Sequence, residues 1–438
     1  MVGRGSQPAI RLHKAADDLV AKATLVHLKA RRAVIQRSAT ARRVFRRSDS
    51  IGRWTASVSG ATAGPFGSLA PPTDEREGHP NRARFFLAAR QPQSQNLSMP
   101  PDFVLRPVEE KDLSGLKGVA TSITDGMTSL PAEESALEDL VHHSQRSFDY
   151  RIKKAGGDHY LFVLEECGTG EIAGTSGIIA RVGGFDPFYT YEVRRERFSH
   201  PPLGIDREME VLHLKLDHKG PSEVGSLCLK PTFRRAGLGQ LLSLARFLFM
   251  AAFPKRFDDR VIAELRGFTD EQGLSPFWES IGRHFFSQTF AEADFLSGIG
   301  QKDFIRDLMP KYPIYAALLP LAAQAVIGKV HRDAEPALRI LLNQGFHRSN
   351  EVDIFDGGPL VIADRAEIKT IREATAAQIA EVRGLGHPSV CLIGHAALDF
   401  RACLAEVEHL DAANIAIEPR TAERLRVKIG SRVIFIPR

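Results

Sequence analysis

Residues 224–253 constrain the fold of this chain more than any other stretch, because they join an apolar strand, a basic loop and a long apolar helix. The extended run ends at Pro231, and apolar side chains recur at helical spacing from Gly239 onward. Between them lies Arg234-x-x-Gly237-x-Gly239. Glycines let backbone N–H groups approach an anion closely, and a helix N-terminus adds the positive end of its dipole. The segment therefore predicts a binding loop for an anionic ligand.

On spacing alone this loop is a weak motif, and an ordinary tight turn stays open as its explanation. The dinucleotide pattern Gly-x-Gly-x-x-Gly and the P-loop pattern Gly-x-x-x-x-Gly-Lys-Ser/Thr are absent, which argues against nicotinamide cofactors and a P-loop ATPase. Arg-x-x-Gly-x-Gly after a strand instead resembles the coenzyme A loop of the GNAT acyltransferase superfamily. The resemblance implies that the strand at 224–229 pairs with the pantetheine arm, and that Arg234, Arg235, Gly237 and Gly239 hold the diphosphate. Without this resemblance, Arg234 and Arg235 would be interpreted as ordinary exposed charges.

Several longer segments resemble the arginine N-succinyltransferase family, in that family's order and over about residues 103–359, with a weaker match through the tail. The resemblance implies transfer of the succinyl group of succinyl-CoA to the α-amine of L-arginine, giving N2-succinylarginine and CoA in arginine catabolism. It implies succinyl-CoA as co-substrate, with no permanently bound cofactor, and a contact between Leu227 and succinyl-CoA through the backbone. The segments are TSLPAEES (128–135), YLFVLEE (160–166), FTDEQGLSPFWESIGRHFF (268–286), LMPKYPIY (308–315), AQAVIGKVH (323–331) and VDIFDGGP (352–359).

Beyond Pro100, predicted strands and helices alternate, which indicates an α+β fold. The superfamily resemblance implies a GNAT-like acyl-CoA transferase core, with a mixed, mostly antiparallel sheet flanked by helices and enlarged by insertions. We expect three regions: a disordered basic extension at 1–98, a succinyltransferase region at 99–362 and a small β-rich appendage at 363–438. The predicted strands are 103–108, 160–164, 172–180, 211–216, 224–229, 261–265 and 352–355, and the predicted helices include 110–122, 133–148 and 334–344.

The charge is unevenly distributed along the chain. Residues 1–98 contain 17 Lys and Arg against 6 Asp and Glu, a net of +11, whereas the remainder has 41 against 47, a net of −6. The basic part lacks amphipathic periodicity and is predicted to be disordered. A reading frame that starts too far upstream, with the natural start near Met99, is the favoured explanation; a polyanion-binding arm and an organelle-type presequence stay open. The acidic remainder does not favour nucleic acid as a partner.

The cysteines, at positions 167, 228, 391 and 403, show neither Cys-x-x-Cys pairing nor dense spacing, so the sequence indicates no structural zinc site and no disulfide framework. No His, Cys, Asp and Glu set has metal-ligand spacing, so no catalytic metal is expected. The longest apolar run, residues 315–330, is interrupted by polar residues and is shorter than the ~20 residues of a membrane span. These observations predict a cytoplasmic protein that is not inserted in a membrane.

His331 is the predicted proton donor, because histidine side chains exchange protons near neutral pH. From position alone, a histidine past a helix end is more often a dipole partner or a surface residue. The family resemblance at AVIGKVH places His331 on the histidine regarded there as the proton donor. The chain has no Gly-x-Ser-x-Gly nucleophile elbow, so direct attack in a ternary complex is the simpler mechanism.

The residues that bind the two charged ends of the substrates are not singled out by the sequence. Arg266, after a predicted strand, is a candidate for the succinyl carboxylate. Acidic residues near the matched segments could face a guanidinium: Glu264, Asp270, Glu271, Asp353 and Asp356.

Two other functions stay open. One is a GNAT acyltransferase with ornithine as acceptor or acetyl-CoA as donor, and the other is a polyanion-binding protein that acts through its basic N-terminal arm. Assembly into a homo-oligomer or with a paralogous subunit is also left open.

Overall fold

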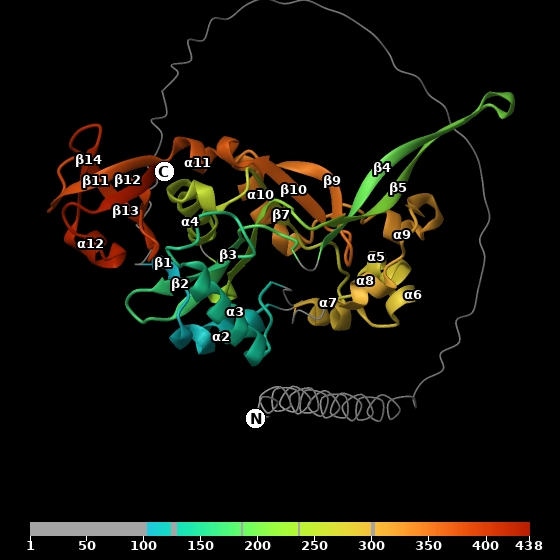
Figure 1. The fold of residues 1–438 in the computed structure, drawn as a ribbon, viewed down its shortest axis with the longest axis horizontal. Helices are drawn as coiled ribbons and strands as arrows, with labels where there is room; N and C mark the ends of the chain where they lie inside the picture. The colour runs from blue at the N-terminus through green and yellow to red at the C-terminus, as the bar shows by residue number, and fades with distance from the viewer. Residues whose placement is uncertain (1–102, 124–128, 185–186, 235–236, 299–302) are drawn as a thin grey trace, which may run out of the picture. The chain divides into compact units, whose positions relative to one another are not determined.

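The computed structural model describes residues 103–123, 129–184, 187–234, 237–298 and 303–438 (Figure 1). The predicted basic extension at 1–98 lies outside the described residues. The described ranges form 15 strands in one hydrogen-bonded sheet, together with helices, which is the α+β class expected from the sequence. In these same ranges, no helix has both the length and the apolar character needed to cross a membrane.

The strand order across the sheet is β12-β15-β11-β14-β13-β1-β2-β3-β6-β7-β10-β9-β4-β5-β8. The pairs are antiparallel except β6 with β7 and β11 with β14, which are parallel. In chain order the strands are β1 (Phe103–Pro107), β2 (His159–Glu166), β3 (Ile172–Ile179), β4 (Phe188–His200), β5 (Ile205–Asp217), β6 (Ser222–Leu229), β7 (Arg260–Glu264), β8 (Ile314–Tyr315), β9 (His347–Asp353), β10 (Pro359–Asp364), β11 (Thr375–Val382), β12 (Ser389–His395), β13 (Ala402–His409), β14 (Asn414–Ile417) and β15 (Arg432–Pro437).

The helices lie between these strands, and several are single turns. They are α2 (Leu113–Thr121), α3 (Glu134–Ser147), α4 (Leu238–Ala252), α5 (Pro276–Ser280), α6 (Gly282–Phe286), α7 (Phe290–Gly298), α8 (Asp303–Leu308), α9 (Leu321–Gln324), α10 (Glu335–Asn343), α11 (Lys369–Glu373) and α12 (Pro419–Leu425). The predicted helices at 110–122, 133–148 and 334–344 correspond to α2, α3 and α10 within a few residues.

Strand β2 is buried on both faces, which explains its continuous apolar sequence. Side chains of a strand alternate between faces, so Tyr160 and Phe162 join the core formed with α4, whereas Leu161 and Val163 pack with residues of α2 and α3. The central sheet therefore lies between two helical layers. This burial fixes the register of β2 against β3. It thereby positions β6, which is the next strand after β3 in the sheet.

Helix α4 is apolar over almost its full length, because it packs against the sheet and is also covered by α10 and α11. Ten of its residues are buried, and one of them is the charged residue Arg246. Burial of each Leu or Phe side chain contributes about 1.5–3 kcal/mol, so this helix is held firmly against the strands beneath it. Its first turn is correspondingly fixed in space.

Strands β4 and β5 form a long antiparallel arm that extends away from the rest of the sheet in Figure 1. They pair with each other over 13 residues each, but β4 contacts β9 only from Thr190 to Glu192, and β5 contacts β8 only at Val211 and Leu212. The sequence did not predict β4, because its outer half is charged and exposed rather than alternating with apolar residues. The outer half of the arm is a two-stranded ribbon.

The C-terminal strands β11–β15 have a hydrophobic core of their own. Strand β12 pairs with both β15 and β13, which closes these five strands into a ring. Strand β13 also pairs with β1 at Leu105 and Ala402, so the ring is hydrogen-bonded to the central sheet. The predicted domain boundary at 362 and 363 stays a prediction.

Candidate active site

The parallel strands β6 and β7 separate soon after they begin. Their register includes only Ser222 with Val261 and Glu223 with Ile262, although β6 continues to Leu229. On its other side β6 remains paired with β3 as far as Leu229. Because carboxyl ends of neighbouring parallel strands face the same edge of a sheet, the segments that follow β6 and β7 meet at one edge.

A bulge in β6 accompanies this separation. Ser226 has a φ of 49°, in the left-handed region, and the register with β3 shifts between Thr175 and Gly177. A non-glycine residue in this region costs about 1–3 kcal/mol and persists only where its surroundings hold it. The Ser226 backbone N–H donates to Ser129 Oγ over 3.2 Å, the Ser226 hydroxyl donates to the Ser129 carbonyl over 3.1 Å, and Thr175 Oγ1 donates to the Ser226 carbonyl over 2.9 Å. The bulge is thus firmly held in place.

Arg246 of α4 supports the same bulge from inside the protein. Its side chain is 1% exposed, and Nη1 donates to the Gly225 carbonyl over 3.1 Å. Among the described residues no carboxylate forms an ion pair with it, and burial lowers its pKa. The helix that covers β6 therefore also anchors the irregular part of that strand. Sequence analysis missed Arg246, Ser226 and Ser129, since their contacts join distant segments.

The predicted binding loop lies at the carboxyl end of β6. Gly237 is the N-cap of α4 with a φ of 93°, which explains the requirement for glycine there, and no side chain of the described residues caps this helix. Gly239 lies in the first turn, and apart from its chain neighbours and the helix's own backbone a Cβ placed on it would have no described atom within 4 Å. Arg234 is exposed, with its Nε donating to the Leu229 carbonyl over 3.3 Å. Arg235 lies outside the described residues.

Leu227 is half-buried and packs against the main core, so its side chain is part of the fold while its backbone belongs to the irregular part of β6. The structure thus brings Leu227, Arg234, Gly237 and Gly239 together along one continuous path, from the bulged strand to the first turn of α4. An anion at this point would meet first-turn backbone N–H groups and the positive end of the helix dipole.

His331 lies beside the segment that follows β7. Its backbone N–H donates to the Arg266 carbonyl over 2.7 Å, and the preceding Val330 forms a β-bridge with Gly267. His331 is the N-cap of a short 3₁₀ turn (Arg332–Ala334), and its Nδ1 accepts from the Asp333 N–H over 3.2 Å. The sequence placed this histidine past a helix end; the structure places it at the start of a helical turn instead. In the neutral ring, this contact leaves the proton on Nε2.

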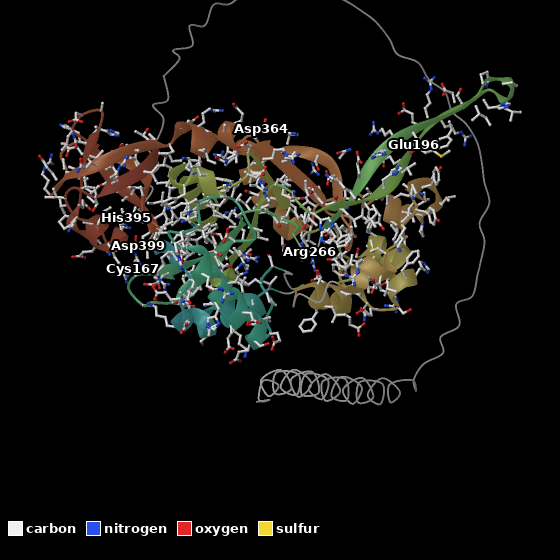
Figure 2. The ribbon with its side chains drawn as sticks, in the orientation of Figure 1. Cys167, Glu196, Arg266, Asp364, His395 and Asp399 are labelled. Atoms are coloured by element: carbon white, nitrogen blue, oxygen red, sulfur yellow. The ribbon has the colours of Figure 1, made fainter. Side chains whose placement is uncertain are left out.

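A buried charged cluster surrounds Arg266, which is labelled in Figure 2. Arg266 Nη1 donates to Asp294 Oδ1 over 3.1 Å, its Nε lies 3.6 Å from Asp356 Oδ2, and its guanidinium carbon lies 4.7 Å from the centre of the Phe290 ring. Burial opposes its charge, but the two aspartates outweigh burial and raise its pKa. Its guanidinium is therefore committed to internal partners, and its carbonyl holds His331.

The carboxylates of Asp353 and Asp356 hold the backbone beside this cluster. Asp353 Oδ1 accepts from the N–H groups of Phe355 and Asp356 over 2.7 and 2.8 Å, which ends β9 at Asp353; the predicted strand at 352–355 is wrong in its last two residues. The Asp356 carboxylate accepts from Gly267 and Gly358, each over 2.8 Å. Burial and the nearby Asp356 raise the pKa of Asp353 to about 8, and burial also raises the pKa of Asp356. Both are structural in this arrangement.

The other acidic candidates are less buried. Asp270 Oδ1 accepts from the N–H groups of Gln272 and Leu274, which makes it a turn residue, and Glu271 is exposed. Glu264 is half-buried at the end of β7, beside the separated strands. In the described ranges, no group of three or more His, Cys, Asp or Glu could hold a metal ion.

Comparisons with known proteins give a consistent result. Residues 103–370 match the family model described as arginine N-succinyltransferase beta subunit, and residues 372–437 match the model of that subunit's C-terminal domain. Proteins named arginine N-succinyltransferase from Salmonella paratyphi B and Salmonella newport are each 42% identical to this chain over 322 residues, which is 73% of this chain and 90% of theirs. The solved structure of arginine/ornithine succinyltransferase subunit AI from Pseudomonas aeruginosa is similar with a TM-score of 0.70 and 34% identity, covering 76% of this chain and 98% of that one.

Proposed function

This chain belongs to the arginine N-succinyltransferase family, and we propose from this premise which of its residues bind the acyl donor and which exchange the proton. The chain is an N-acyltransferase of arginine catabolism: the succinyl group of succinyl-CoA passes to the α-amine of L-arginine, giving N2-succinylarginine and CoA. In this reaction a C–N bond forms and the thioester C–S bond breaks. The amine loses a proton, and the departing thiolate gains one.

The donor site in this proposal is the path from β6 to the first turn of α4, within a GNAT-like core. The pantetheine arm pairs with the backbone near Leu227, where β6 has left β7. The diphosphate lies against the N–H groups at Gly237 and Gly239, with Arg234 and Arg235 as cations. The observation that carries the proposal is a bulge in β6, followed along the chain by a helix that starts at Gly237 and is capped by no side chain of the described residues. Succinyl-CoA binds and leaves in each cycle, and no permanently bound cofactor is proposed.

His331 is the proposed proton donor to the thiolate. Because Nδ1 faces the Asp333 N–H, Nε2 is the ring nitrogen that exchanges the proton with the reacting groups. Arg266 acts as a positioning residue, since its carbonyl holds the His331 backbone while Asp294 and Asp356 hold its guanidinium.

The amine attacks the thioester directly in this mechanism, without an acyl-enzyme. An acyl-enzyme would require a nucleophile, and Cys228 in β6, beside the proposed donor site, is the candidate thiol. Burial raises the pKa of this thiol to about 11, so it stays protonated at neutral pH. Direct attack needs no such group.

Thiol release from succinyl-CoA, measured side by side with arginine, ornithine and lysine, tests the function. We expect release that depends on arginine, and a product whose mass equals arginine plus one succinyl group. Ornithine is the second candidate acceptor, because the similar Pseudomonas protein is named for both amino acids. Release with acetyl-CoA but not with succinyl-CoA would favour the alternative donor. Salt-sensitive DNA binding that requires residues 1–98, without thiol release, would favour the polyanion-binding alternative.

We propose that the chain assembles with a copy of itself or with a paralogous subunit. Among the described residues, no third strand pairs with the outer half of the β4–β5 arm, and an isolated two-stranded ribbon is marginally stable in water. At its base, Tyr312, Leu318 and Leu321 are more than 80% exposed. Light scattering during size-exclusion chromatography would test this: a monomer at micromolar concentration argues against self-assembly.

A cytoplasmic location remains the proposal. It is supported by four free cysteines, of which Cys228, Cys391 and Cys403 are buried and Cys167 is exposed. Detection of the native protein in the soluble cytoplasmic fraction after cell lysis would test the location directly.

A further inference from the structure

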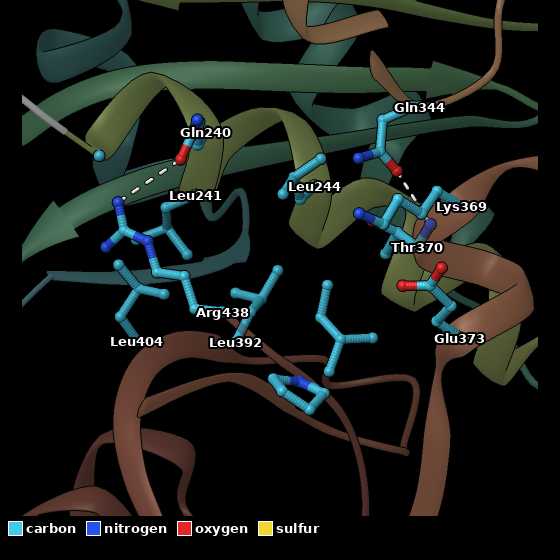
Figure 3. Close-up of a pocket in the computed structure, with 13 residues that line it drawn as sticks. Gln240, Leu241, Leu244, Gln344, Lys369, Thr370, Glu373, Leu392, Leu404 and Arg438 are labelled. Atoms are coloured by element: carbon cyan, nitrogen blue, oxygen red, sulfur yellow. Dashed lines mark hydrogen bonds between the residues drawn. The ribbon is translucent and has the colours of Figure 1, made fainter. Parts of the chain in front are cut away.

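A cavity of about 190 Å³ lies between the first turns of α4, helix α11 and the end of β15 (Figure 3). It begins at Gly237, the N-cap of α4, so it is continuous with the proposed diphosphate loop. Ligand pockets typically exceed about 300 Å³, so a cavity of this size takes one end of a ligand whose remainder lies outside. The position and the size together point to an extension of the donor site.

At one end of the cavity, the guanidinium of Arg438 lies close to Gly237 of the proposed diphosphate loop. Arg438 Nη2 lies 3.4 Å from Gln240 Oε1, and a Cβ on Gly237 would come within 2.9 Å of the same nitrogen (Figure 3). The backbone N–H of Arg438 donates to the Val390 carbonyl over 3.0 Å, which attaches this residue to β12. A cation from the C-terminal ring is therefore held at the start of α4.

The other end of the cavity carries polar groups suited to a nucleoside. Thr370 is 1% exposed, lines the cavity, and has a hydroxyl without a hydrogen-bond partner among the described residues. A buried hydroxyl without a partner is unfavourable, and a ligand that hydrogen-bonds to it would remove that penalty. Gln344 is also buried there and accepts the Thr370 N–H through Oε1 over 2.9 Å. The adjacent Lys369 is exposed and adds a second cation.

Between these ends the wall is apolar, formed by leucine and isoleucine side chains of α4 and of the C-terminal ring. The order of features is thus a cation beside the diphosphate loop, an apolar wall, and then a hydroxyl, an amide and a second cation. Glu373 also lines the cavity, and its Oε1 accepts from Arg372 Nη2 over 3.4 Å. A phosphorylated nucleoside matches this order of groups.

We propose that this cavity binds the 3′-phosphoadenosine end of the acyl donor, with Arg438 on the diphosphate side and with Thr370 and Lys369 at the nucleoside end. The inference rests on the proposed donor site in β6 and α4. It makes the C-terminal ring part of the substrate site, because Arg438 contributes a contact that the GNAT-like region does not provide. The strands β11–β15 then have a role in binding as well as in folding.

The test uses the full chain with adenosine 3′,5′-bisphosphate and coenzyme A as probes in isothermal titration calorimetry. We expect Arg438→Ala to weaken binding of both probes about 10-fold and Thr370→Val about 5-fold, whereas Arg432→Ala, an exposed arginine on the same strand, leaves both unchanged. Lys369→Ala should reduce the preference for coenzyme A over dephospho-coenzyme A. The bisphosphate should also inhibit thiol release competitively with succinyl-CoA.

Wild-type affinity for both probes in Arg438→Ala and Thr370→Val would overturn the inference, and so would inhibition that is not competitive with succinyl-CoA. Thermal unfolding of each variant checks that the fold is retained. These binding measurements do not depend on acyl transfer. Failure of the proposed function would appear separately, as the absence of arginine-dependent thiol release in the wild-type protein.

Discussion

The backbone N–H of His331 donates to the carbonyl oxygen of Arg266 over 2.7 Å, which attaches the proposed proton donor to the segment that follows β7. The binding loop follows β6, the parallel neighbour of β7. The two parts of the proposed site thus come from the carboxyl ends of adjacent parallel strands. In the proposed mechanism the thioester lies between loop and histidine, where these strands have separated after Glu223.

Gly239→Ala should change stability and substrate binding in opposite directions. Alanine stabilises a helix by up to about 1 kcal/mol relative to glycine, and the structure has room for its Cβ. If a phosphate approaches the Gly239 N–H, the same methyl group occupies that space, and we expect the KM for succinyl-CoA to rise about 10-fold. Urea unfolding and steady-state kinetics on the same sample measure the two effects. An unchanged KM would remove Gly239 from the donor site.

Gly237→Ala is the matched substitution, and it should lower both the stability of the protein and its affinity for succinyl-CoA. Its φ of 93° strains any L side chain, and the new Cβ would lie 2.9 Å from Arg438 Nη2. We expect a lower free energy of unfolding, by about 1 kcal/mol or more, together with a higher KM for succinyl-CoA. A variant as stable as the wild type would show that the loop adopts a different conformation.

Arg234→Ala should raise the KM for succinyl-CoA about 10-fold with little change in kcat, because a charge-assisted contact to phosphate contributes about 1.5–3 kcal/mol. The side chain is exposed, so folding should not be affected. Added salt should raise the wild-type KM more than that of the variant. Arg195→Ala, an exposed arginine in β4, is the control and should behave as wild type. Equal salt dependence in both variants would argue against a role for Arg234.

The pH dependence of stability should carry a contribution from Asp353. Its pKa is raised from 3.8 to about 8, so between these values the folded protein holds a proton that the unfolded chain releases. The free energy of unfolding therefore falls as pH rises through this window, by at most about 1.4 kcal/mol per pH unit from this group. Asp353→Asn should flatten the curve between pH 5 and 8, while the exposed Asp364→Asn should not. Parallel curves for wild type and Asp353→Asn would contradict the raised pKa.

The strand, loop and helix at the donor site could be predicted because each depends on local pattern: apolar residues in β6, glycines at the loop, and helical periodicity in α4. The bulge at Ser226 could not, because its partner Ser129 is 97 residues away in the sequence. A serine with positive φ has no local sequence signal. The elements of this segment were thus predictable, and the bulge in its strand was not.

The remaining differences have two causes. Strand β4 was missed because its outer half is exposed and charged, so it shows no apolar alternation. Arg438 was not a candidate, since its position over Gly237 depends on β15 packing beside α4. The resemblance identified His331, but its attachment to Arg266 required the bridge between Gly267 and Val330. Contacts between distant segments account for Arg438 and for the attachment of His331, whereas β4 lacked a local signal.

The most direct test of the proposed chemistry compares His331→Ala with the wild-type protein in two measurements: kcat for arginine-dependent thiol release, and the Kd for coenzyme A. We expect kcat to fall about 100-fold or more while the Kd stays within about 2-fold, because proton transfer contributes to the reaction but not to donor binding. Turnover near the wild-type value would contradict the assignment of His331 as proton donor. A wild-type protein without measurable affinity for coenzyme A would contradict the donor site as a whole.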